Sequence, residues 1–382
     1  MKVFRNSWNG IEATMAFSPD KRIAVFFTHG VSLELWEKRG MFSREVQFYQ
    51  ELAREVGEVW LFTYGEHDEQ YLNRLGPNIR LFQKNCKCPP SHYALMLPFV
   101  YRKQLKQVDA IRIHQVAGAI PALLAHWLYR KPLIVRAGFQ WYRFAKRQGA
   151  SRLKRAAISM IERLAYRSAG AIIHTTQADA DFVATRYHIP RGKIHVIPNW
   201  VDTELFRLMT VEKQPRTVCY VGRLEKQKNL DTLVEAMQGL NARLIVYGEG
   251  SLQHTLEEQA RALGVDVKFR GRVANEELPA ALNACEIFVL PSLYEGNPKV
   301  LLEAMACGLP VVGTNVEGIN TLIKDKETGL LCETTANSLQ ETLKRLLNNH
   351  ELQNRIGEQA RKQILSTASL DQAIQNELSF YS

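Results

Sequence analysis

The hydrophobic positions of the chain fall into two kinds of stretch that take turns along the sequence. Short apolar runs have the character of buried parallel strands, whereas longer stretches place apolar residues three or four positions apart, as in amphipathic helices. Regular alternation of the two predicts doubly wound parallel sheets. In the first half, strands are expected at residues 22–27, 59–63, 79–82, 110–114, 133–135, 171–175 and 194–197, and helices at 43–56, 91–107, 119–129, 152–168 and 177–187.

The alternation pauses at residues 207–216, which we interpret as a linker, and then starts again. Residues 1–20 fit no clear element and are expected to form an edge strand or a loose arm. The pattern therefore predicts two α/β domains of ordinary size. In the second half, strands are expected at residues 217–222, 243–250, 267–273, 286–290 and 309–312, and helices at 230–239, 276–284, 298–306, 338–364 and 370–381.

The stretch from Leu290 to Val312 is the most informative part of the chain. An apolar strand is broken at Pro291 and followed by a polar loop, a helix and a second strand, which is a βαβ unit. Asn297 is a favourable N-cap and Pro298 suits the first helical position, so the helix is expected to begin there. Its free N–H groups would face the Glu295-Gly296 loop and offer an anion site.

Two glutamates of this stretch are candidates for binding one polar ligand. Glu303 lies within an otherwise apolar helix, where a carboxylate is costly unless something specific uses it. It lies roughly 7.5 Å along the helix axis from Pro298 at ~1.5 Å per residue. Glu295 and Glu303 could therefore grip two ends of one ligand. The alternative is that Glu303 is a solvated helix residue and Glu295 an ordinary loop residue.

Two cations follow the first strand of the second half. That strand ends at Gly222, and Arg223 and Lys228 come in the turn after it. Two cations at a βα turn suit a diphosphate, because they neutralise it in the ground state and stabilise it as it leaves. A pair of ordinary surface cations is the alternative.

The first half contributes a glycine and a histidine at strand ends. Gly30 follows the first strand, where a glycine lets the backbone approach a phosphate. His114 ends the strand at 110–114, and ligands of doubly wound sheets bind beyond the carboxyl ends of strands. His29 competes for this role, whereas His174 lies within a strand and is expected in the core.

Charge is distributed unevenly over the 382 residues, whose net charge is +10. Residues 1–205 have a net charge of +13 and residues 206–382 one of −3, and residues 110–178 contain twelve Lys and Arg but a single acid. Trp141, Tyr142 and Phe144 lie in that basic segment. Basic amphipathic helices beside exposed aromatic residues bind anionic membranes. The alternative is a helix at 152–168 that packs its apolar stripe on the sheet and exposes only a basic face.

The remaining composition indicates a cytoplasmic protein. The N-terminus lacks an apolar signal-peptide core, and no window resembles a spanning helix. Cys86 and Cys88 form a lone C-x-C without the second pair that a zinc site needs, and Cys219 and Cys285 are expected in the core. We interpret the cysteines as reduced and expect no metal site. No nucleic-acid recognition module is present, so nucleic acid is not an expected partner.

The segment EGNPKVLLEAMACGLPVVGT, with seven residues between Glu295 and Glu303, resembles the signature of family-4 glycosyltransferases of the GT-B fold. The segment IPNWVD…F at 197–206 resembles that family's domain junction, with Trp200 in place of the usual glycine, and Arg223 and Lys228 match a further motif. The resemblance is specific from about residue 190 to 332 and only architectural before that.

This resemblance implies two Rossmann-like doubly wound domains facing an interdomain cleft. Residues 1–205 would bind the acceptor, residues 206–366 would bind a nucleotide sugar, and residues 367–382 would form a helix that crosses back to the first domain. The implied catalytic residues are Glu295, His114, Arg223 and Lys228. The implied donor-binding residues are Gly30, Gly222, Arg223, Lys228, Val273, Glu295, Gly296, Asn297, Pro298, Lys299 and Glu303.

Within the donor site, the resemblance places Glu295 beside the sugar, Glu303 on the ribose and the backbone near Val273 at the base. The implied activity is retaining, metal-independent sugar transfer from a UDP- or GDP-type donor, with no further cofactor. The acceptor would be a lipid-linked or polysaccharide precursor of a cell-surface glycan, met on the inner face of the cell membrane. A nucleotide-sugar epimerase and a non-catalytic sugar-nucleotide-binding subunit remain alternatives.

Overall fold

The computed structural model describes residues 20–381, so the edge strand or arm expected at residues 1–20 lies almost wholly outside the described residues. The described chain divides into two compact units. The first contains residues 20–174, 179–195 and 374–381, and the second contains residues 175–178 and 196–373. The chain thus leaves the first unit, builds the second, and returns to the first with its last residues.

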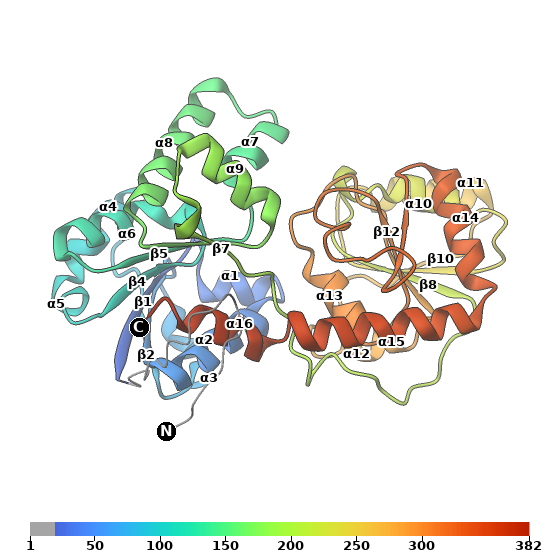
Figure 1. Cartoon of the computed structure of the whole chain (residues 1–382), viewed down its shortest axis with the longest axis horizontal. Helices are drawn as coiled ribbons and strands as arrows, with labels where there is room; N and C mark the ends of the chain where they lie inside the picture. Colours follow the sequence, from blue (N-terminus) through green and yellow to red (C-terminus); the bar gives the residue numbers. More distant parts are fainter. Residues whose placement is uncertain (1–19, 382) are drawn as a thin grey trace. The chain divides into compact units, whose positions relative to one another are not determined.

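The first unit is built on a seven-stranded sheet with the order β3-β2-β1-β4-β5-β6-β7, in which the strands from β3 to β6 pair in parallel. Helices α2 and α16 cover one face of the sheet, and α4, α6 and α8 cover the other (Figure 1). The strands are β1 (Lys21–Phe26), β2 (Gly57–Phe62), β3 (Ile79–Phe82), β4 (Ala110–Ile113), β5 (Leu133–Ala137), β6 (Ala171–His174) and β7 (Ile194–Val196). The helices are α1 (Leu33–Lys38), α2 (Phe42–Val56), α3 (Leu72–Leu75), α4 (Pro90–Val100), α5 (Arg102–Leu105), α6 (Ala119–Tyr129), α7 (Trp141–Arg147), α8 (Arg152–Ser168), α9 (Gln177–Tyr187) and α16 (Leu370–Leu378).

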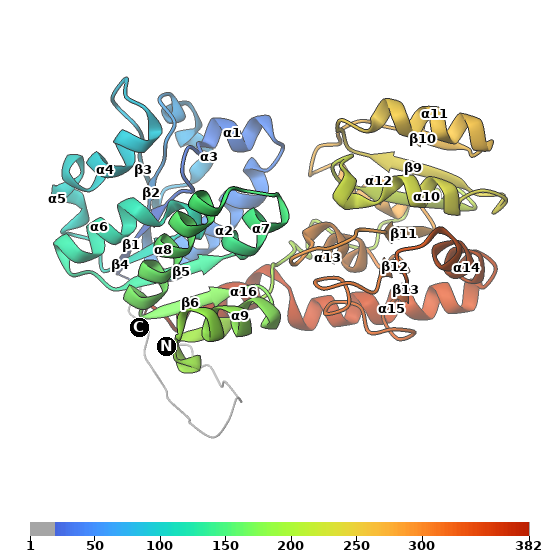
Figure 2. The same cartoon turned by 90° about the horizontal axis from the view of Figure 1, so that it is seen from above.

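The second unit is built on a six-stranded parallel sheet with the order β10-β9-β8-β11-β12-β13. Helices α10, α11 and α14 lie on one side of the sheet and α12, α13 and α15 on the other (Figures 1 and 2). The strands are β8 (Thr217–Val221), β9 (Arg243–Tyr247), β10 (Val267–Phe269), β11 (Ile287–Leu290), β12 (Val311–Thr314) and β13 (Leu330–Cys332). The helices are α10 (Leu230–Ala236), α11 (Gln253–Leu263), α12 (Leu278–Asn283), α13 (Lys299–Ala306), α14 (Ala336–Leu347) and α15 (His350–Thr367).

Both sheets reverse their strand order at one point. In the first sheet, β1 lies between β2 and β4, and in the second, β8 lies between β9 and β11. Connections leave such a pair of strands in opposite directions, which opens a crevice beyond their carboxyl ends where ligands of open α/β sheets bind. The loops after β1, β4, β8 and β11 are therefore the places where the topology positions a site.

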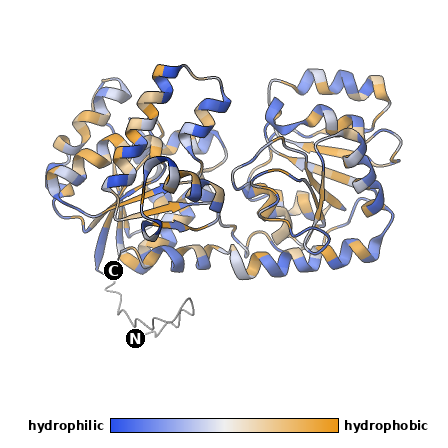
Figure 3. Cartoon of the chain, turned by 45° about the horizontal axis from the view of Figure 1, so that its top comes forward, coloured by the Kyte–Doolittle hydropathy of each residue, from blue (hydrophilic) through white to orange (hydrophobic). Residues whose placement is uncertain are grey.

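The predicted fold class is confirmed, and the strands account for it physically. Residues 23–27 of the first sheet and 287–290 of the second are fully buried, as parallel strands covered on both faces must be. Figure 3 colours the strands of both sheets as mainly hydrophobic, whereas many helices carry one hydrophobic and one hydrophilic side. In the part of the chain that the structure describes, no helix has the length and apolar content needed to cross a bilayer.

Two expected helices are each broken by a tertiary contact or a cap. The helix expected at 91–107 divides at Tyr101, whose ring packs against Phe62 and Phe82 and whose hydroxyl donates to the Gln83 carbonyl oxygen. The helix expected at 338–364 divides before Asn349, whose side chain accepts from the Leu352 N–H at 2.9 Å and starts α15. Helices α1, α3, α7 and α11 were not predicted.

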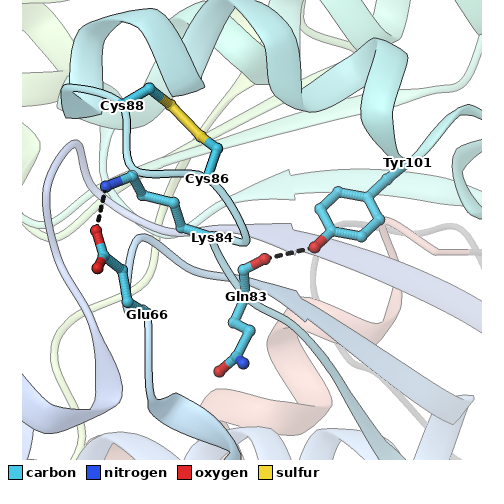
Figure 4. The surroundings of a disulfide bond; sticks show 6 residues. All are labelled: Glu66, Gln83, Lys84, Cys86, Cys88 and Tyr101. Carbon is cyan, nitrogen blue, oxygen red and sulfur yellow. Dashed lines mark hydrogen bonds and ion pairs between the residues drawn. A yellow bond between two sulfur atoms is a disulfide. The ribbon is translucent and has the colours of Figure 1, made fainter.

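The interpretation of all six cysteines as reduced is wrong for one pair. Cys86 and Cys88 form a disulfide in the loop after β3 (Figure 4). Ion pairing between Lys84 and Glu66 and the bond from Tyr101 to Gln83 hold the chain just before it. The other four cysteines are buried free thiols, as expected for Cys219 and Cys285.

Candidate active site

The loops after β8 and β9 are held together by glycines. Gly222 has a φ of +155° and its N–H donates to the Tyr247 carbonyl oxygen at 2.9 Å. Gly248 has a φ of +134°, and a Cβ at this position would lie 1.9 Å from the Gly222 carbonyl oxygen. Because no other residue fits this approach, the turn that carries Arg223 is fixed against the neighbouring strand end.

Lys228 and Glu295 meet across the reversal point between β8 and β11. The Lys228 ammonium lies 2.5 Å from Oε1 of Glu295, and the two side chains are only 12% and 9% exposed. Ser292 donates its hydroxyl to the same carboxylate oxygen at 2.7 Å. The loops are also joined by Gln227, which accepts from the Leu293 N–H and donates to the Tyr294 carbonyl oxygen, both at 2.9 Å. A cation and a carboxylate are thus preorganised beyond the ends of both strands.

Arg223 does not join this pair. Its side chain is 66% exposed and forms an ion pair with Glu225 at 2.7 Å. The Arg223 carbonyl oxygen accepts from the Tyr220 hydroxyl at 3.1 Å, which fixes the backbone of the turn. The guanidinium therefore lies at the rim of the loops, and Lys228 is the buried cation of the two.

The expected helix start at Asn297 and Pro298 is wrong by one residue. Pro298 is the N-cap, it has no side-chain cap hydrogen bond, and α13 begins at Lys299. Asn297 instead accepts from the Asn199 backbone N–H at 2.8 Å, and the Asn199 side chain donates to the Asn297 carbonyl oxygen at 2.7 Å. The Asn297 side chain is used to tie two loops of the second unit together, which explains why it does not cap the helix.

Two further contacts shape the start of α13. The Lys299 ammonium lies over the Trp200 ring, 5.4 Å from its centroid, so the tryptophan that replaces the family's glycine packs on a predicted site residue. Gly318 has a φ of +90°, and a Cβ there would lie 2.2 Å from the Gly296 carbonyl oxygen. The Glu295-Gly296 backbone is therefore confined by the loop after β12.

Glu303 is buried on α13 with 4% exposure, so the alternative of a solvated helix residue is wrong. Burial, together with the negative charge of Glu303, raises the pKa of the Cys307 thiol to about 12. Val273, the residue implied near the base, follows β10 and is half-buried. Among residues 20–381, no three His, Cys, Asp or Glu side chains are arranged to hold a metal ion.

His114 lies at the corresponding point of the first sheet, directly after β4. Its Nδ1 lies 2.6 Å from the Tyr49 hydroxyl, and its Nε2 lies 4.0 Å from Oε2 of Glu45. The ring also packs against Phe27 and Trp36. Gly30, after β1, has a φ of +72° and is exposed with open space around its Cα, so it leaves room for a ligand at this strand end.

The Tyr49 hydroxyl connects His114 to buried charges. Arg112 donates to this hydroxyl at 3.1 Å and to both carboxylate oxygens of Glu377 on α16. Burial opposes both charges, but their mutual attraction prevails, so the pKa of Arg112 lies above its ordinary value and that of Glu377 below. Burial also raises the pKa of Tyr49, which keeps its proton.

The two other histidines considered in the sequence, His29 and His174, differ in their exposure to solvent. His29 is exposed in the loop after β1, and its ring lies 5.4 Å from that of Tyr64. His174 is fully buried in β6, as expected, and burial lowers its pKa to about 4. Sequence reasoning missed the roles of Tyr49, Ser292 and Asn199. The sequence signal for Tyr49 is a tyrosine on the apolar face of a predicted helix. The signal for Ser292 and Asn199 is a polar residue directly after a proline that follows a strand.

Two family models match the chain. The model described as Glycosyltransferase Family 4 matches residues 40–205, and the model described as Glycosyl transferases group 1 matches residues 202–363. Together they span most of both units.

Curated relatives carry transferase names. The alpha-D-kanosaminyltransferase of Streptomyces kanamyceticus is 27% identical over 287 residues, which are 68% of this chain and 74% of that protein. The UDP-Gal:alpha-D-GlcNAc-diphosphoundecaprenol alpha-1,3-galactosyltransferase of Escherichia coli is 26% identical over 252 residues, which are 60% of this chain and 63% of that protein. The second match therefore spans less than two thirds of the relative's length.

Solved structures share the fold. A crystal structure of Anabaena Alr3699/HepE in complex with UDP and glucose superimposes with a TM-score of 0.73 at 18% identity, covering 94% of this chain and 98% of that chain. The sucrose-phosphate synthase of Thermosynechococcus elongatus gives a TM-score of 0.74 at 21% identity with the same coverage. At these identities the likeness establishes the fold alone.

Proposed function

Because the chain belongs to the group 1, family-4 glycosyltransferases of the GT-B fold, we propose that it transfers a sugar from a nucleotide-diphosphate sugar to a lipid-linked or polysaccharide precursor of a cell-surface glycan. We further propose that the reaction retains the anomeric configuration and needs no metal. In this proposal, residues 1–205 bind the acceptor, residues 206–366 bind the donor, and residues 367–382 form the helix that returns to the first domain.

The observation that carries the proposal is the Lys228–Glu295 pair at the reversal point of the second sheet. A diphosphate at this place meets the Lys228 ammonium, the exposed Arg223 guanidinium and the backbone of the Gly222 turn. Glu295 orients the ammonium and supplies a carboxylate close to the sugar that the diphosphate carries. Cations preorganised at a leaving group act most strongly as its charge develops, which is the service that a metal would otherwise supply.

The nucleoside part of the donor extends from this pair along α13. Glu303 is proposed to accept from ribose hydroxyls, because its carboxylate lies buried on the helix that follows Glu295, at the position that the family resemblance assigns to the ribose. Backbone near Val273 is proposed to meet the base. Gly296, Asn297, Pro298 and Lys299 form the connection between sugar and ribose. The base is proposed to be the uracil of UDP or the guanine of GDP, and UDP is the nucleotide named for the Anabaena structure.

His114 and Gly30 are proposed to bind the sugar end of the donor. Both lie at the reversal point of the first sheet, where its topology positions ligands. We propose that the acceptor hydroxyl attacks the anomeric carbon on the face from which the diphosphate departs. The departing diphosphate receives the acceptor's proton, and Lys228 and Arg223 stabilise the charge that develops on it.

A lipid-linked acceptor is favoured by the surface of the first unit. The apolar stripe of α8, which under the alternative interpretation would pack on the sheet, is exposed, with Leu153 85% and Met160 65% accessible, while Ile158, Ala165 and Tyr166 form the buried face. Arg152, Lys154, Arg163 and Arg167 are exposed on the same helix. An exposed apolar stripe between cations is the composition of a helix that lies in an anionic membrane surface.

Neighbouring helices extend this surface. Helix α6 packs between α4 and α8, and Figure 3 colours much of α4 and α6 as hydrophobic. We call the combined exposed apolar set the α4–α6–α8 face. It comprises Leu95, Met96, Phe99, Val100, Ile120, Trp127, Leu128, Leu153, Met160 and Leu164. By contrast, Trp141, Tyr142 and Phe144 are half-buried in α7, and Tyr142 is stacked with the Arg186 guanidinium, so they contribute less than the sequence predicted.

The test begins with calorimetric titration of the protein with UDP, GDP and other nucleoside diphosphates. The matching nucleotide sugars are then incubated with polyprenyl-diphosphate-linked sugars in anionic vesicles, with and without EDTA. A transferred sugar with unchanged anomeric configuration, formed in EDTA, is the expected result. Conversion of the donor to another sugar nucleotide without acceptor would establish the epimerase alternative, and binding without hydrolysis or transfer would establish the non-catalytic subunit.

A further inference from the structure

We propose that Glu377, Arg112 and Tyr49 are positioning residues that hold His114 as the tautomer protonated on Nε2. This inference rests on the proposed function only for the role of His114 in transfer. The four residues come from α16, β4, α2 and the end of β4, and all lie within the first unit.

The chain of contacts is continuous and buried. Glu377 is fully buried and receives hydrogen bonds from Nε and Nη2 of Arg112, which is itself 1% exposed. The Nη1 group of Arg112 donates to the Tyr49 hydroxyl at 3.1 Å, and that hydroxyl lies 2.6 Å from Nδ1 of His114. Tyr381 donates to Glu377 at 2.7 Å, and the Arg136 guanidinium lies 3.7 Å from the same carboxylate.

The direction of the hydrogen bonds follows from the donor and acceptor inventory. A guanidinium can only donate, so the Tyr49 hydroxyl oxygen is the acceptor of the bond from Arg112. The hydroxyl proton is then directed to the nitrogen at 2.6 Å, which makes Nδ1 of His114 the acceptor and places the ring proton on Nε2. The Nε2 side of the ring faces the Glu45 carboxylate at 4.0 Å.

This tautomer has a chemical consequence. With its Nδ1 lone pair occupied and its Nε2 protonated, a neutral His114 has a hydrogen-bond donor and no lone pair on its Nε2 side. It can bind a sugar or phosphate oxygen, but it cannot remove a proton from the acceptor. That property fits a reaction in which the departing diphosphate, rather than a protein base, receives the acceptor's proton.

Burial of the ion pair argues for a positioning role. A buried pair of charges is often no more stabilising than packed apolar residues, because desolvation offsets the attraction. Here the pair presents one guanidinium N–H in a fixed direction, toward a tyrosine hydroxyl that also contacts the histidine. Buried polar networks of this kind fix the geometry of the group at their end.

The test is nitrogen NMR of protein labelled with ¹⁵N-histidine at pH 8, where an unperturbed imidazole is neutral. The His114 signals are assigned from their loss in His114→Gln. In the wild-type protein, Nε2 should show a directly bonded proton and Nδ1 none. In Tyr49→Phe, which removes only the hydroxyl, this tautomer should no longer be the only one present, and the form protonated on Nδ1 should become detectable.

Tyr381→Phe is the matched control, because it removes a buried tyrosine hydrogen bond to Glu377 without breaking the path to His114. It should leave the tautomer as in the wild type. In transfer assays, Tyr49→Phe should lower kcat by about tenfold, the size of one hydrogen bond, with less effect on the donor KM. Glu377→Gln, which weakens the hold on Arg112, should act in the same direction.

Retention of the Nε2-protonated tautomer as the only form in Tyr49→Phe would overturn the positioning role, whether or not transfer is detected. A changed tautomer in a protein that transfers no sugar would support the positioning role and overturn the proposed function alone. The two proposals are therefore tested separately.

Discussion

The Lys228 ammonium and the Glu295 carboxylate are 67 positions apart in sequence and form a nearly buried ion pair, 2.5 Å apart, beyond the adjacent strands β8 and β11. The pair neutralises the two charges in the absence of ligand. Under the proposed function, a diphosphate that enters beside it would share the ammonium and free part of the carboxylate's hydrogen-bonding capacity for the sugar. We therefore propose that the pair couples phosphate binding to the state of Glu295.

Lys228→Ala should weaken binding of the nucleoside diphosphate by about tenfold or more, because a charge-assisted hydrogen bond contributes roughly 1.5–3 kcal/mol. Binding of the free nucleoside should change little. Calorimetry with both ligands measures the difference, and Lys226→Ala, an exposed lysine of the same turn, is the control. Equal losses for both ligands would show that Lys228 does not contact phosphate.

Glu303→Gln and Glu295→Gln should affect different kinetic parameters. A carboxylate on the ribose holds ground state and transition state alike, so Glu303→Gln should weaken nucleotide affinity and raise the donor KM. One beside the sugar acts mainly as charge develops, so Glu295→Gln should mainly lower kcat. Glu327→Gln, on an exposed glutamate of the same unit, is the control. Unchanged nucleotide affinity in Glu303→Gln would disprove the ribose assignment.

The protein should pellet with anionic vesicles through the α4–α6–α8 face. Each Lys or Arg near the surface contributes about 1 kcal/mol, and salt screens the attraction within ~8–10 Å. Co-sedimentation should need anionic lipid, fall with salt, and drop in the charge variant Arg152, Lys154 and Arg163→Gln. Arg155 of the same helix is left unchanged in this variant because it is half-buried.

The apolar part of the same face has its own test. Leu153→Ser with Met160→Ser should reduce pelleting even at low salt, because insertion of side chains does not depend on ionic strength. Leu365→Ser, on α15 of the second unit, removes an exposed leucine outside this face and should have no effect. If pelleting does not depend on lipid charge, on salt or on either variant, this face does not dock on membranes. The acceptor would then be a freely diffusing molecule.

His174 should make the protein less stable in acid. Burial lowers its pKa from 6.5 to about 4, so between these values the unfolded chain binds a proton that the folded chain does not. The contribution of the neutral His174 to the free energy of unfolding is fully present above pH 6.5 and is lost as pH falls toward 4. At pH 5 the loss amounts to about 2 kcal/mol. Urea unfolding at pH 7.5 and 5.0 should show a smaller loss in His174→Leu than in the wild type. His92→Gln, at an exposed position, should behave as the wild type, and parallel losses in all three proteins would contradict the assignment.

Most strands and helices of both units could be predicted from sequence because periodicity reports burial directly. Helices α6, α8 and α9 begin and end where their patterns predicted. The meeting of Lys228 and Glu295 was also foreseeable, since both follow strands whose carboxyl ends share one edge of a sheet. Which face of α8 is buried was not, because its apolar stripe and its buried face differ, and only the packing partner decides between them.

The contacts that sequence could not predict join distant segments through single side chains. Asn297 has the composition of an N-cap, but the nearby Asn199 backbone takes its side chain. Glu377 looks like a surface acid of a terminal amphipathic helix until β4 places Arg112 beside it. The disulfide between Cys86 and Cys88 depends on the loop conformation after β3, which no periodic pattern encodes.

The return of residues 374–381 to the first unit has a consequence for synthesis of the chain. Arg112 and Arg136 emerge from the ribosome 265 and 241 residues before Glu377, their buried counter-charge. Domains usually fold as they emerge, the N-terminal one first. Here Arg112 and Arg136 can meet the Glu377 carboxylate only after the second domain has been synthesised. We therefore expect that the first domain reaches its final packing only when α16 has been made.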